Sequence, residues 1–375
     1  MNEMLARQIF DRNKMVRFSS KLNIKGHAVD KIIRDHNDIL EKLISDQYIP
    51  AKLRTVSIPK DDGSFRSIEI NSDLDRIICA CINEYLSDQA DSSFCDYNYG
   101  FRVKRGCIDA VLKVEEFINA GYPWSVKADI AKCFDNVDQD MARFMVSKWV
   151  DDAGLRKIIH RFMNVPVRGS STKRTKGLQQ GNNLSPLLMN MVLSRFDKTL
   201  YSRGIKFVRY ADDICILKSS ERAAMRARDS IEALLCKEFK LGINNDKLAL
   251  GHINSGLHLF GFLMKGVPVS IEVSRSSILK FYDHIKSMLS EPSVSSKRLN
   301  AYIKGWFGYF KLGISPALAY SLDSTVKVLI LEACTDNRTY IRMDGVVSIA
   351  TLLNNGTIYS GNKKICSYGS KEHTL

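Results

Sequence analysis

The sequence predicts an α+β fold in which helices alternate with antiparallel hairpins. Apolar residues recur at helical spacing through much of the chain, which indicates amphipathic helices. Short strand-like runs instead come in neighbouring pairs joined by tight turns, which is typical of hairpins. Such pairs argue against a doubly wound parallel sheet. The 375 residues suffice for two or three structural units.

The N-terminal third combines helices with one hairpin. Residues 1–48 are expected to be helical, because Ile32, Ile39, Leu43 and similar residues form one apolar face. The runs LRTVSIPK and FRSIEI flank a DDGS turn, in which Gly63 tolerates positive φ. Further helices are expected over 71–90 and 107–120, with a Gly-, Tyr- and Asn-rich loop between them.

The rest of the chain repeats this alternation. A strand over 122–130 precedes a helical region at 138–163 and a basic loop at 168–177. A helix from Ser185 to Arg203 has Pro186 at its start, where the missing N–H costs nothing. KFVRY and DICIL then form a hairpin, and the remaining expectations are a helix over 220–240, strands in LHLFGFLMKG and VPVSIEV, and helices over 274–331.

The charge balance indicates a polyanionic partner. The chain carries 55 Lys and Arg against 41 Asp and Glu, a formal charge of +14. Nucleic acid is the commonest partner of such a protein, although a generally basic surface is the alternative. No apolar run reaches the length of a membrane span, and the charged start is no secretory signal, so we expect a cytoplasmic protein with no membrane partner. The nine cysteines lack zinc spacing.

Three carboxylates stand at the ends of apolar strands. Asp129 ends one strand in VKADIAKCFDNVD, and Asp212 and Asp213 lie at the tip of the hairpin RYADDICIL. Neighbouring carboxylates at a buried sheet edge repel each other and lose solvation unless cations neutralise them. Hard oxygen ligands suit Mg²⁺, and two such ions support phosphoryl transfer. Either segment taken alone could equally supply ordinary turn or capping residues.

These segments, in this order, resemble reverse transcriptases, and most of all the bacterial group II intron class, from about residue 50 to 312. The motifs are SIPKDDGSFRSIEI, NYGFRVKRG, ADIAKCFDNVD, GLQQGNNLSPLL, RYADDICIL, LGINNDKLAL, LHLFGFLMK and KRLNAYIKGWFGYF. The resemblance implies a right-hand polymerase with fingers, a palm of antiparallel sheet and helices, and a helical thumb. The implied divisions are a helical extension at 1–50, fingers at 51–122, palm at 123–272 with part of the fingers at about 140–178, thumb at 273–335, and a final extension at 336–375.

The resemblance also implies residue roles around two Mg²⁺ ions, for which Mn²⁺ can substitute. Asp129, Asp212, Asp213 and Ile130 would form the metal site, and Lys247 would be a general acid near the leaving pyrophosphate. The nucleotide-binding residues would be Lys60, Arg66, Ile130, Phe134, Gln180 and Gly181, with Phe134 selecting deoxynucleotides. The primer and template residues would be Arg102, Tyr210, Ala211, Phe260, Gly261 and Trp306. Solvated turn or surface charges remain the alternative for Lys60, Arg66 and Lys247, and a core position for Phe134.

The implied partners are an RNA template, a DNA primer or cDNA product, and dNTPs. Residues 275–330 carry eight Lys or Arg against three Asp or Glu, which suits a clamp on a phosphate backbone. The group II pattern has a smaller residue where Asn182 stands. We also find no room for an RNase H domain and no Cys/His array of an intron endonuclease. We therefore expect a dedicated non-coding RNA template and a role in antiphage defence. The alternatives are a maturase-like RNA-binding protein and a protein-primed or template-independent polymerase; the oligomeric state is not predicted.

Overall fold

The computed structural model describes residues 1–24, 26–59, 63, 65–169, 174–291, 294–335, 345–354, 359–360 and 363–364. The chain divides into two compact units. The first comprises Met1–Arg105, Val126–Ile216 and Met225–Ala249, and the second comprises Gly106–Ser125, Leu217–Ala224 and Leu250–Leu375. Lys60 and most of the predicted DDGS turn lie outside the described residues.

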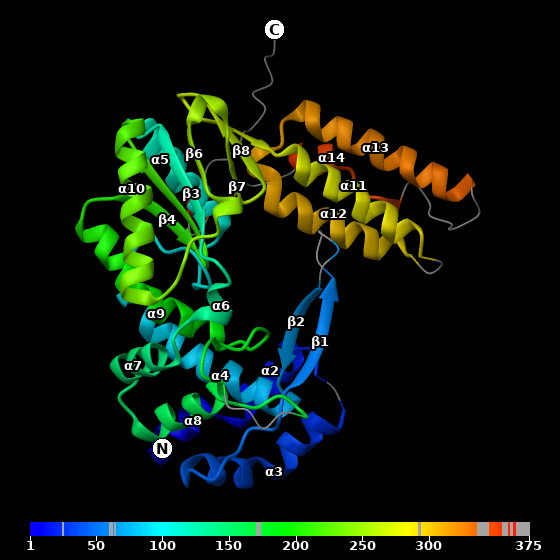
Figure 1. The fold of residues 1–375 in the computed structure, drawn as a ribbon. Helices are drawn as coiled ribbons and strands as arrows, with labels where there is room; N and C mark the ends of the chain where they lie inside the picture. Colours follow the sequence, from blue (N-terminus) through cyan, green and yellow to red (C-terminus); the bar gives the residue numbers. More distant parts are fainter. Residues whose placement is uncertain are drawn as a thin grey trace. The chain divides into compact units, whose positions relative to one another are not determined.

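The first unit opens with a helical layer, as the sequence predicts. Its members are α1 (Glu3–Ile9), α2 (Arg12–Lys21), α3 (His27–Ile44) and α4 (Asp73–Ala90), and α2 packs on both α3 and α4 (Figure 1). Asn2, Asp11 and Ser72 cap the N-termini of α1, α2 and α4. The buried Asp75 carboxylate ties the chain after α3 to α4, because it accepts hydrogen bonds from Tyr48 Oη at 2.8 Å and Ala51 N at 3.0 Å.

The predicted hairpin is confirmed by β1 (Arg54–Pro59) and β2 (Phe65–Ile70), which pair antiparallel with Ile58 opposite Arg66. Most of β1 is exposed, whereas the last three residues of β2 are half-buried. The reason is that β2 meets a second segment of the unit: Glu69 N donates to Gln180 O at 3.0 Å.

A four-stranded sheet presents the predicted carboxylates. Its order is β4 (Lys206–Tyr210), β5 (Asp213–Lys218), β3 (Trp124–Asp129) and β6 (Ala249–His252). The middle residues of β4 and β5 are buried, which explains why most of them are apolar. The almost wholly buried helix α9 (Ser185–Ser202) packs against β4. Helix α10 (Glu221–Leu234) ends in a π-helical turn at Leu235–Phe239, within the predicted 220–240 helix.

The helical region predicted at 138–163 is two helices. After the short α6 (Cys133–Asn136), α7 (Gln139–Trp149) stops at Val150, whose backbone is extended, and α8 (Ala153–Met163) begins again. Asp152 causes the restart, because its carboxylate caps α8 by accepting from Leu155 N at 2.6 Å. The other Asp152 oxygen accepts from Asn2 N at 3.1 Å, so a contact distant in sequence stabilises the break.

The second unit holds a three-stranded sheet and a helical bundle. It contains α5 (Cys107–Asn119) and the antiparallel strands β7 (Leu257–Leu259), β8 (Phe262–Lys265) and β9 (Ser270–Val273). The helices α11 (Arg275–Leu289), α12 (Ser296–Phe310), α13 (Pro316–Thr335) and α14 (Ile349–Asn354) share one apolar core, which includes Phe281, Leu299 and Leu322. Asp323 of α13 caps α14 by accepting from Ile349 N and Ala350 N.

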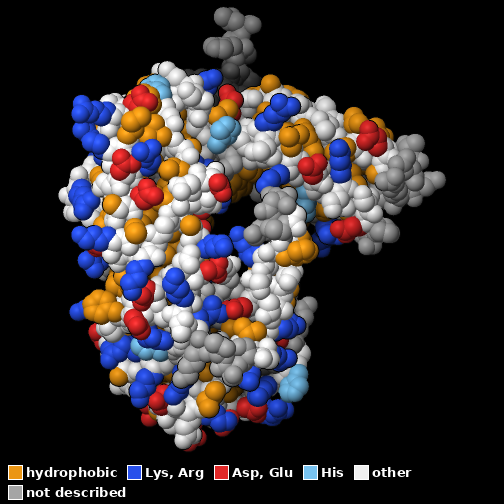
Figure 2. Space-filling model, viewed as in Figure 1, with side chains coloured by type: hydrophobic (Ala, Val, Ile, Leu, Met, Phe, Trp, Pro, Cys, Tyr) orange, Lys and Arg blue, Asp and Glu red, His pale blue; other side chains and the backbone are white. Residues whose placement is uncertain are grey.

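Short elements complete the description. The 3₁₀ turns are Asp91–Ser93, Asn245–Lys247, Ile253–Ser255 and Lys311–Gly313, and β10 (Tyr359–Ser360) pairs with β11 (Lys363–Lys364). Lys and Arg side chains are scattered over the face shown in Figure 2. Within the described ranges, the helices are all too short or too polar to span a bilayer.

Candidate active site

The sheet brings Asp129 and Asp212 to neighbouring positions. Asp129 is the last residue of β3, and Asp212 lies in the turn between β4 and the adjacent strand β5. Ile130 N donates to Asp212 O at 3.0 Å, and Asn244 N donates to Asp129 O at 2.8 Å. Backbone hydrogen bonds therefore fix both main chains at this edge of the sheet, as expected for a site that requires rigid carboxylates.

The carboxylates create a strongly acidic environment. Burial raises the pKa of Asp212, and the nearby charge of Asp129 raises it further. Burial likewise raises the pKa of Asp213, with Asp212 and Asp129 as the next causes. Desolvated like charges of this kind are costly and mark candidate functional sites.

Two cations face this acidic group. Lys247 Nζ donates to Asp129 Oδ2 at 2.9 Å, and this hydrogen bond is the main cause of the raised pKa of Lys247. The Lys247 side chain is still 60% exposed, so it can reach a ligand in solvent. The charge of Arg66 on β2 acts on the Asp212 carboxylate and lowers its pKa against the effect of burial. The structure thus places Lys247 and Arg66 near the carboxylates.

The donor chemistry suits a divalent metal, but the described side chains form no compact cluster. No three His, Cys, Asp or Glu side chains among the residues that the structure describes are gathered to hold one ion. Asp129 and Asp212 nevertheless interact electrostatically and offer hard carboxylate oxygens, the ligands that Mg²⁺ prefers. The predicted metal role of Ile130 stays a prediction; the structure shows that its residue is buried and that its N–H bonds Asp212.

The turn before Asp212 has an unusual backbone. Ala211 is buried and has a φ of +57°, in the left-handed region that non-glycine residues seldom adopt. Gly100 packs directly against it: a Cβ on Gly100 would lie 2.3 Å from Ala211 N. The Tyr210 ring lies 6.2 Å from the ring of the exposed Phe101. Contacts of Tyr210 and Ala211 with a primer remain predictions.

The predicted nucleotide residues Phe134, Gln180 and Gly181 lie in two connected segments. Leu178 N donates to Phe134 O at 2.7 Å, and Gln180 Nε2 donates to Asp135 Oδ1 at 2.7 Å. Gly181 has a φ of +100° and abuts β2. The structure therefore joins the Phe134 segment, the 178–181 segment and the hairpin that carries Arg66. Their contact with a nucleotide is still a prediction.

A buried amide chain beside Gly181 was missed by sequence reasoning. Asn182 Nδ2 donates to Gln179 Oε1 at 3.2 Å, and Gln179 Nε2 donates to Asn71 Oδ1 at 2.6 Å and to Glu69 O at 2.8 Å. Asn182, Gln179 and Asn71 are all buried. The unusual Asn182 therefore has a physical role, because it helps to fix the end of β2 to this segment.

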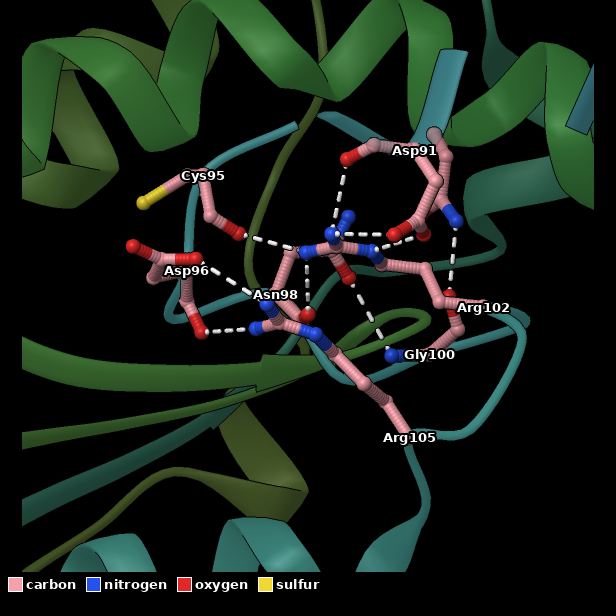
Figure 3. Close-up of polar contacts among 8 residues, drawn as sticks. Asp91, Cys95, Asp96, Asn98, Gly100, Arg102 and Arg105 are labelled. Carbon is pink, nitrogen blue, oxygen red and sulfur yellow. Dashed lines mark hydrogen bonds and ion pairs between the residues drawn. The ribbon is translucent and has the colours of Figure 1, made fainter. Parts of the chain in front are cut away.

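The prediction that Arg102 faces the template is wrong. Its side chain is only 2% exposed, and all its N–H groups are used within the loop that follows α4 (Figure 3). Nε and Nη2 bond Asp91, with Nε–Oδ1 at 2.7 Å, while Nη1 donates to Cys95 O at 2.8 Å and Asn98 O at 3.0 Å. Arg102 therefore organises the 91–102 loop and has no donor left for a phosphate.

Phe260, Gly261 and Trp306 belong to the second unit. Tyr309 Oη donates to Phe260 O at 3.0 Å, and Gly261 O accepts from Ser274 N at 2.9 Å. The Trp306 ring packs 4.4 Å from the Phe281 ring and 4.7 Å from the Phe310 ring. The structure thus shows a turn fixed to the helical bundle and a half-buried tryptophan. Primer contacts of these residues stay a prediction.

Comparison with known proteins shows which family has this arrangement of motifs. The family described as reverse transcriptase (RNA-dependent DNA polymerase) matches residues 58–277. The chain belongs to the reverse transcriptase family. The group II intron maturase-specific domain matches residues 278–336, a range that covers most of α11 and all of α12 and α13 in the second unit. Together with the observed helices and antiparallel sheets, the family match supports the predicted right-hand polymerase fold.

Similar proteins come from bacteria and from yeast, and two of the three described here are named for introns. The group II intron-encoded protein LtrA of Lactococcus lactis subsp. cremoris is 28% identical over 207 residues, which are 52% of this chain and 34% of LtrA. Protein YkfC of Escherichia coli (strain K12) is 25% identical over 262 residues, 59% of this chain and 68% of YkfC. The putative COX1/OXI3 intron 2 protein of Saccharomyces cerevisiae is 22% identical over 317 residues, 68% of this chain and 36% of that protein.

The chain therefore spans about a third of the length of LtrA and of the yeast protein. Among solved structures, apo telomerase from Candida tropicalis matches with a TM-score of 0.48 and 13% identity, covering 82% of this chain and 64% of that one.

Proposed function

We propose that this chain is an RNA-directed DNA polymerase that extends a DNA primer with dNTPs on an RNA template. The observation that carries the proposal is the joint placement of Asp129, Asp212 and Lys247 at one sheet edge. The family match over 58–277 supports the same chemistry. The match of residues 278–336 to a maturase-specific domain supports RNA binding by the basic helical bundle.

Each residue of the candidate site has its own role in nucleotidyl transfer. Asp129, Asp212 and Asp213 would hold the predicted Mg²⁺ ions, which when bound stabilise the charge that develops at the transferred phosphorus. Lys247 is protonated at neutral pH, because the ordinary pKa of a lysine is about 10.4, and it donates a proton toward the leaving pyrophosphate. Arg66 supplies a positive charge for the triphosphate from β2. Phe134 closes the space that a 2′-hydroxyl would occupy.

Replacing both Asp212 and Asp213 by Ala tests the proposal. We expect incorporation of dTTP on a poly(rA)/oligo(dT) template to be abolished, while circular dichroism and the melting temperature show a folded protein. The matched control is Asp229→Ala with Glu232→Ala, which removes two exposed carboxylates of the first unit. Retained polymerisation in the Asp212 and Asp213 variant would reject the mechanism.

The template as a dedicated non-coding RNA, and a role in antiphage defence, remain predictions from the sequence. Sequencing the RNA that copurifies with the protein, together with newly made cDNA, tests the first. One dominant RNA species supports it, and intron RNA or a diverse mixture contradicts it. Phage plating on cells with the active protein and with the Asp212 and Asp213 variant tests the second, since equal plating would exclude a defence role that depends on synthesis.

A further inference from the structure

A buried ionic network lies behind the turn that carries Asp212. Arg209 of β4 and Asp197 of α9 are both fully buried, and they form a bidentate pair with Nε–Oδ1 at 2.7 Å and Nη2–Oδ2 at 2.6 Å. Such a pair adds little net stability over well-packed apolar residues, because desolvation offsets the attraction. Its geometry, however, holds the guanidinium plane in one orientation.

The remaining nitrogen of Arg209 reaches the turn itself. Nη1 donates to Ala211 O at 2.9 Å and to Asn190 Oδ1 at 3.1 Å. The Ala211 carbonyl and the Asp212 N–H belong to one planar peptide group. A bond that fixes this carbonyl therefore fixes the direction in which the chain enters Asp212, and it also supports the positive φ of Ala211.

Asn190 connects this network to the loop organised by Arg102. Its Nδ2 donates to Gly100 O at 2.7 Å, and Gly100 itself packs against Ala211 N. The same loop pairs with β4 through both backbone groups of Arg209. Tyr99 N donates to Arg209 O at 2.8 Å, and Arg209 N donates to Tyr97 O at 2.9 Å. The turn is thus held by a side-chain network and by a packed loop, and both meet at Asn190.

We propose that Asn190 and Arg209 are positioning residues that hold the Ala211–Asp212 peptide in its reactive orientation. The inference rests on the proposed polymerase function, in which Asp212 is catalytic. Neither side chain is accessible to a substrate, since Arg209 is fully buried and Asn190 is 1% exposed. Their effect must pass through the turn, and displacements of about 1 Å in a catalytic group cost on the order of 100-fold in rate.

Asn190→Ala removes the links to both Arg209 and Gly100, and Ser194→Ala is its matched control. Ser194 lies one turn further along α9, is equally buried, and its hydroxyl donates to Met191 O within the helix. We expect the Asn190 variant to lose about tenfold or more in kcat for dTTP incorporation, with KM changed less than about threefold. We also expect faster hydrogen–deuterium exchange in the segment 206–213 than in the control.

Gly100→Ala tests the same idea without removing a buried polar group, and it decides the matter if Asn190→Ala does not fold. Its added methyl group displaces Ala211 N, so the same loss of kcat and the same faster exchange are expected. A kcat equal to that of Ser194→Ala, or faster exchange without loss of kcat, would overturn the proposal. If the unmodified protein makes no cDNA, the proposed polymerase function itself is wrong. Separately, unchanged hydrogen–deuterium exchange of residues 206–213 in the variants would show that the Asn190 and Arg209 network does not order the turn.

Discussion

Gly181→Ala should disturb the junction between β2 and the 178–182 segment. Gly181 has a φ of +100°, and a Cβ there would lie 2.5 Å from Ile68 Cγ2 and 2.8 Å from the Glu69 carbonyl oxygen. The side chain of Ile68 could rotate, but Glu69 O belongs to the backbone of the strand. The substitution therefore either strains the junction or pushes β2, which carries Arg66, away from it.

The magnitude follows from two terms. An L-residue in the left-handed region costs about 1–2 kcal/mol relative to glycine. Overpacking at contacts far inside the usual carbon–carbon distance of about 3.5–4.0 Å typically costs about 1–3 kcal/mol. If β2 stays in place, the free energy of unfolding should fall by about 2–5 kcal/mol. If β2 moves instead, the cost should appear as weaker nucleotide binding, with about tenfold in KM for each 1.4 kcal/mol.

Denaturant unfolding and steady-state dTTP incorporation measure the two outcomes separately. Gly242→Ala is the control, because Gly242 is exposed, its φ lies outside the left-handed region, and a Cβ there meets nothing within 4 Å. The control should be neutral or slightly stabilising. A Gly181 variant that matches it in both the unfolding free energy and KM would refute the inference that close backbone packing at Gly181 fixes β2.

Three further predictions concern single contacts. Lys247→Ala should lower kcat about 100-fold or more at unchanged melting temperature. Lys157→Ala removes a similarly exposed and ion-paired lysine and should leave kcat unchanged. Equal kcat values for the two variants would exclude the general-acid role of Lys247. Asp75→Ala should lower the unfolding free energy by about 2–3 kcal/mol, because it leaves buried donors unpaired, and Tyr48→Phe should cost less. Asp138→Ala removes the α7 cap and should cost about 1 kcal/mol at pH 7. The hydrogen bond from Lys240 lowers the pKa of Asp138 from its ordinary value of 3.8. The Asp138 carboxylate therefore stabilises the fold above pH 3.8, and this stabilisation is lost as the pH falls through the lowered pKa. A destabilisation by Asp138→Ala that persists below the lowered pKa would contradict this reasoning.

Hydrophobic periodicity and turn residues predicted the elements that are determined by residues close together in the sequence. The strand runs that became β4 and β5 are mostly apolar, and the turn between them is confirmed by the structure. The break at 150–152 was not predicted, because the apolar spacing continues through it. It depends on Asp152, whose capping role is visible in the sequence, and on the contact with Asn2, which is not.

The buried polar networks were harder to predict because their partners are distant in sequence. Arg102 resembled a template-binding cation, yet its partners are the Asp91 carboxylate and carbonyls of an irregular loop that no periodicity reveals. A usable signal existed for the Arg209 network. Asn190 and Asp197 are seven residues apart within an apolar helix, hence on one face, and Arg209 interrupts the apolar run KFVRY. Buried polar residues need partners, so these positions should have been paired.

Asn182 shows how a departure from a family pattern can be explained by contacts instead of by a change of function. The sequence comparison made it an irregular position beside the predicted nucleotide site. In the structure its amide bonds Gln179, which bonds both Asn71 and the backbone of Glu69. A glycine at this position could not make that bond, and Gln179 would lose a partner inside a buried environment, where an unpaired polar group costs about 1–3 kcal/mol. The asparagine is therefore consistent with an intact polymerase site, in which the β2 junction is held by side-chain amides as well as by the close approach of Gly181.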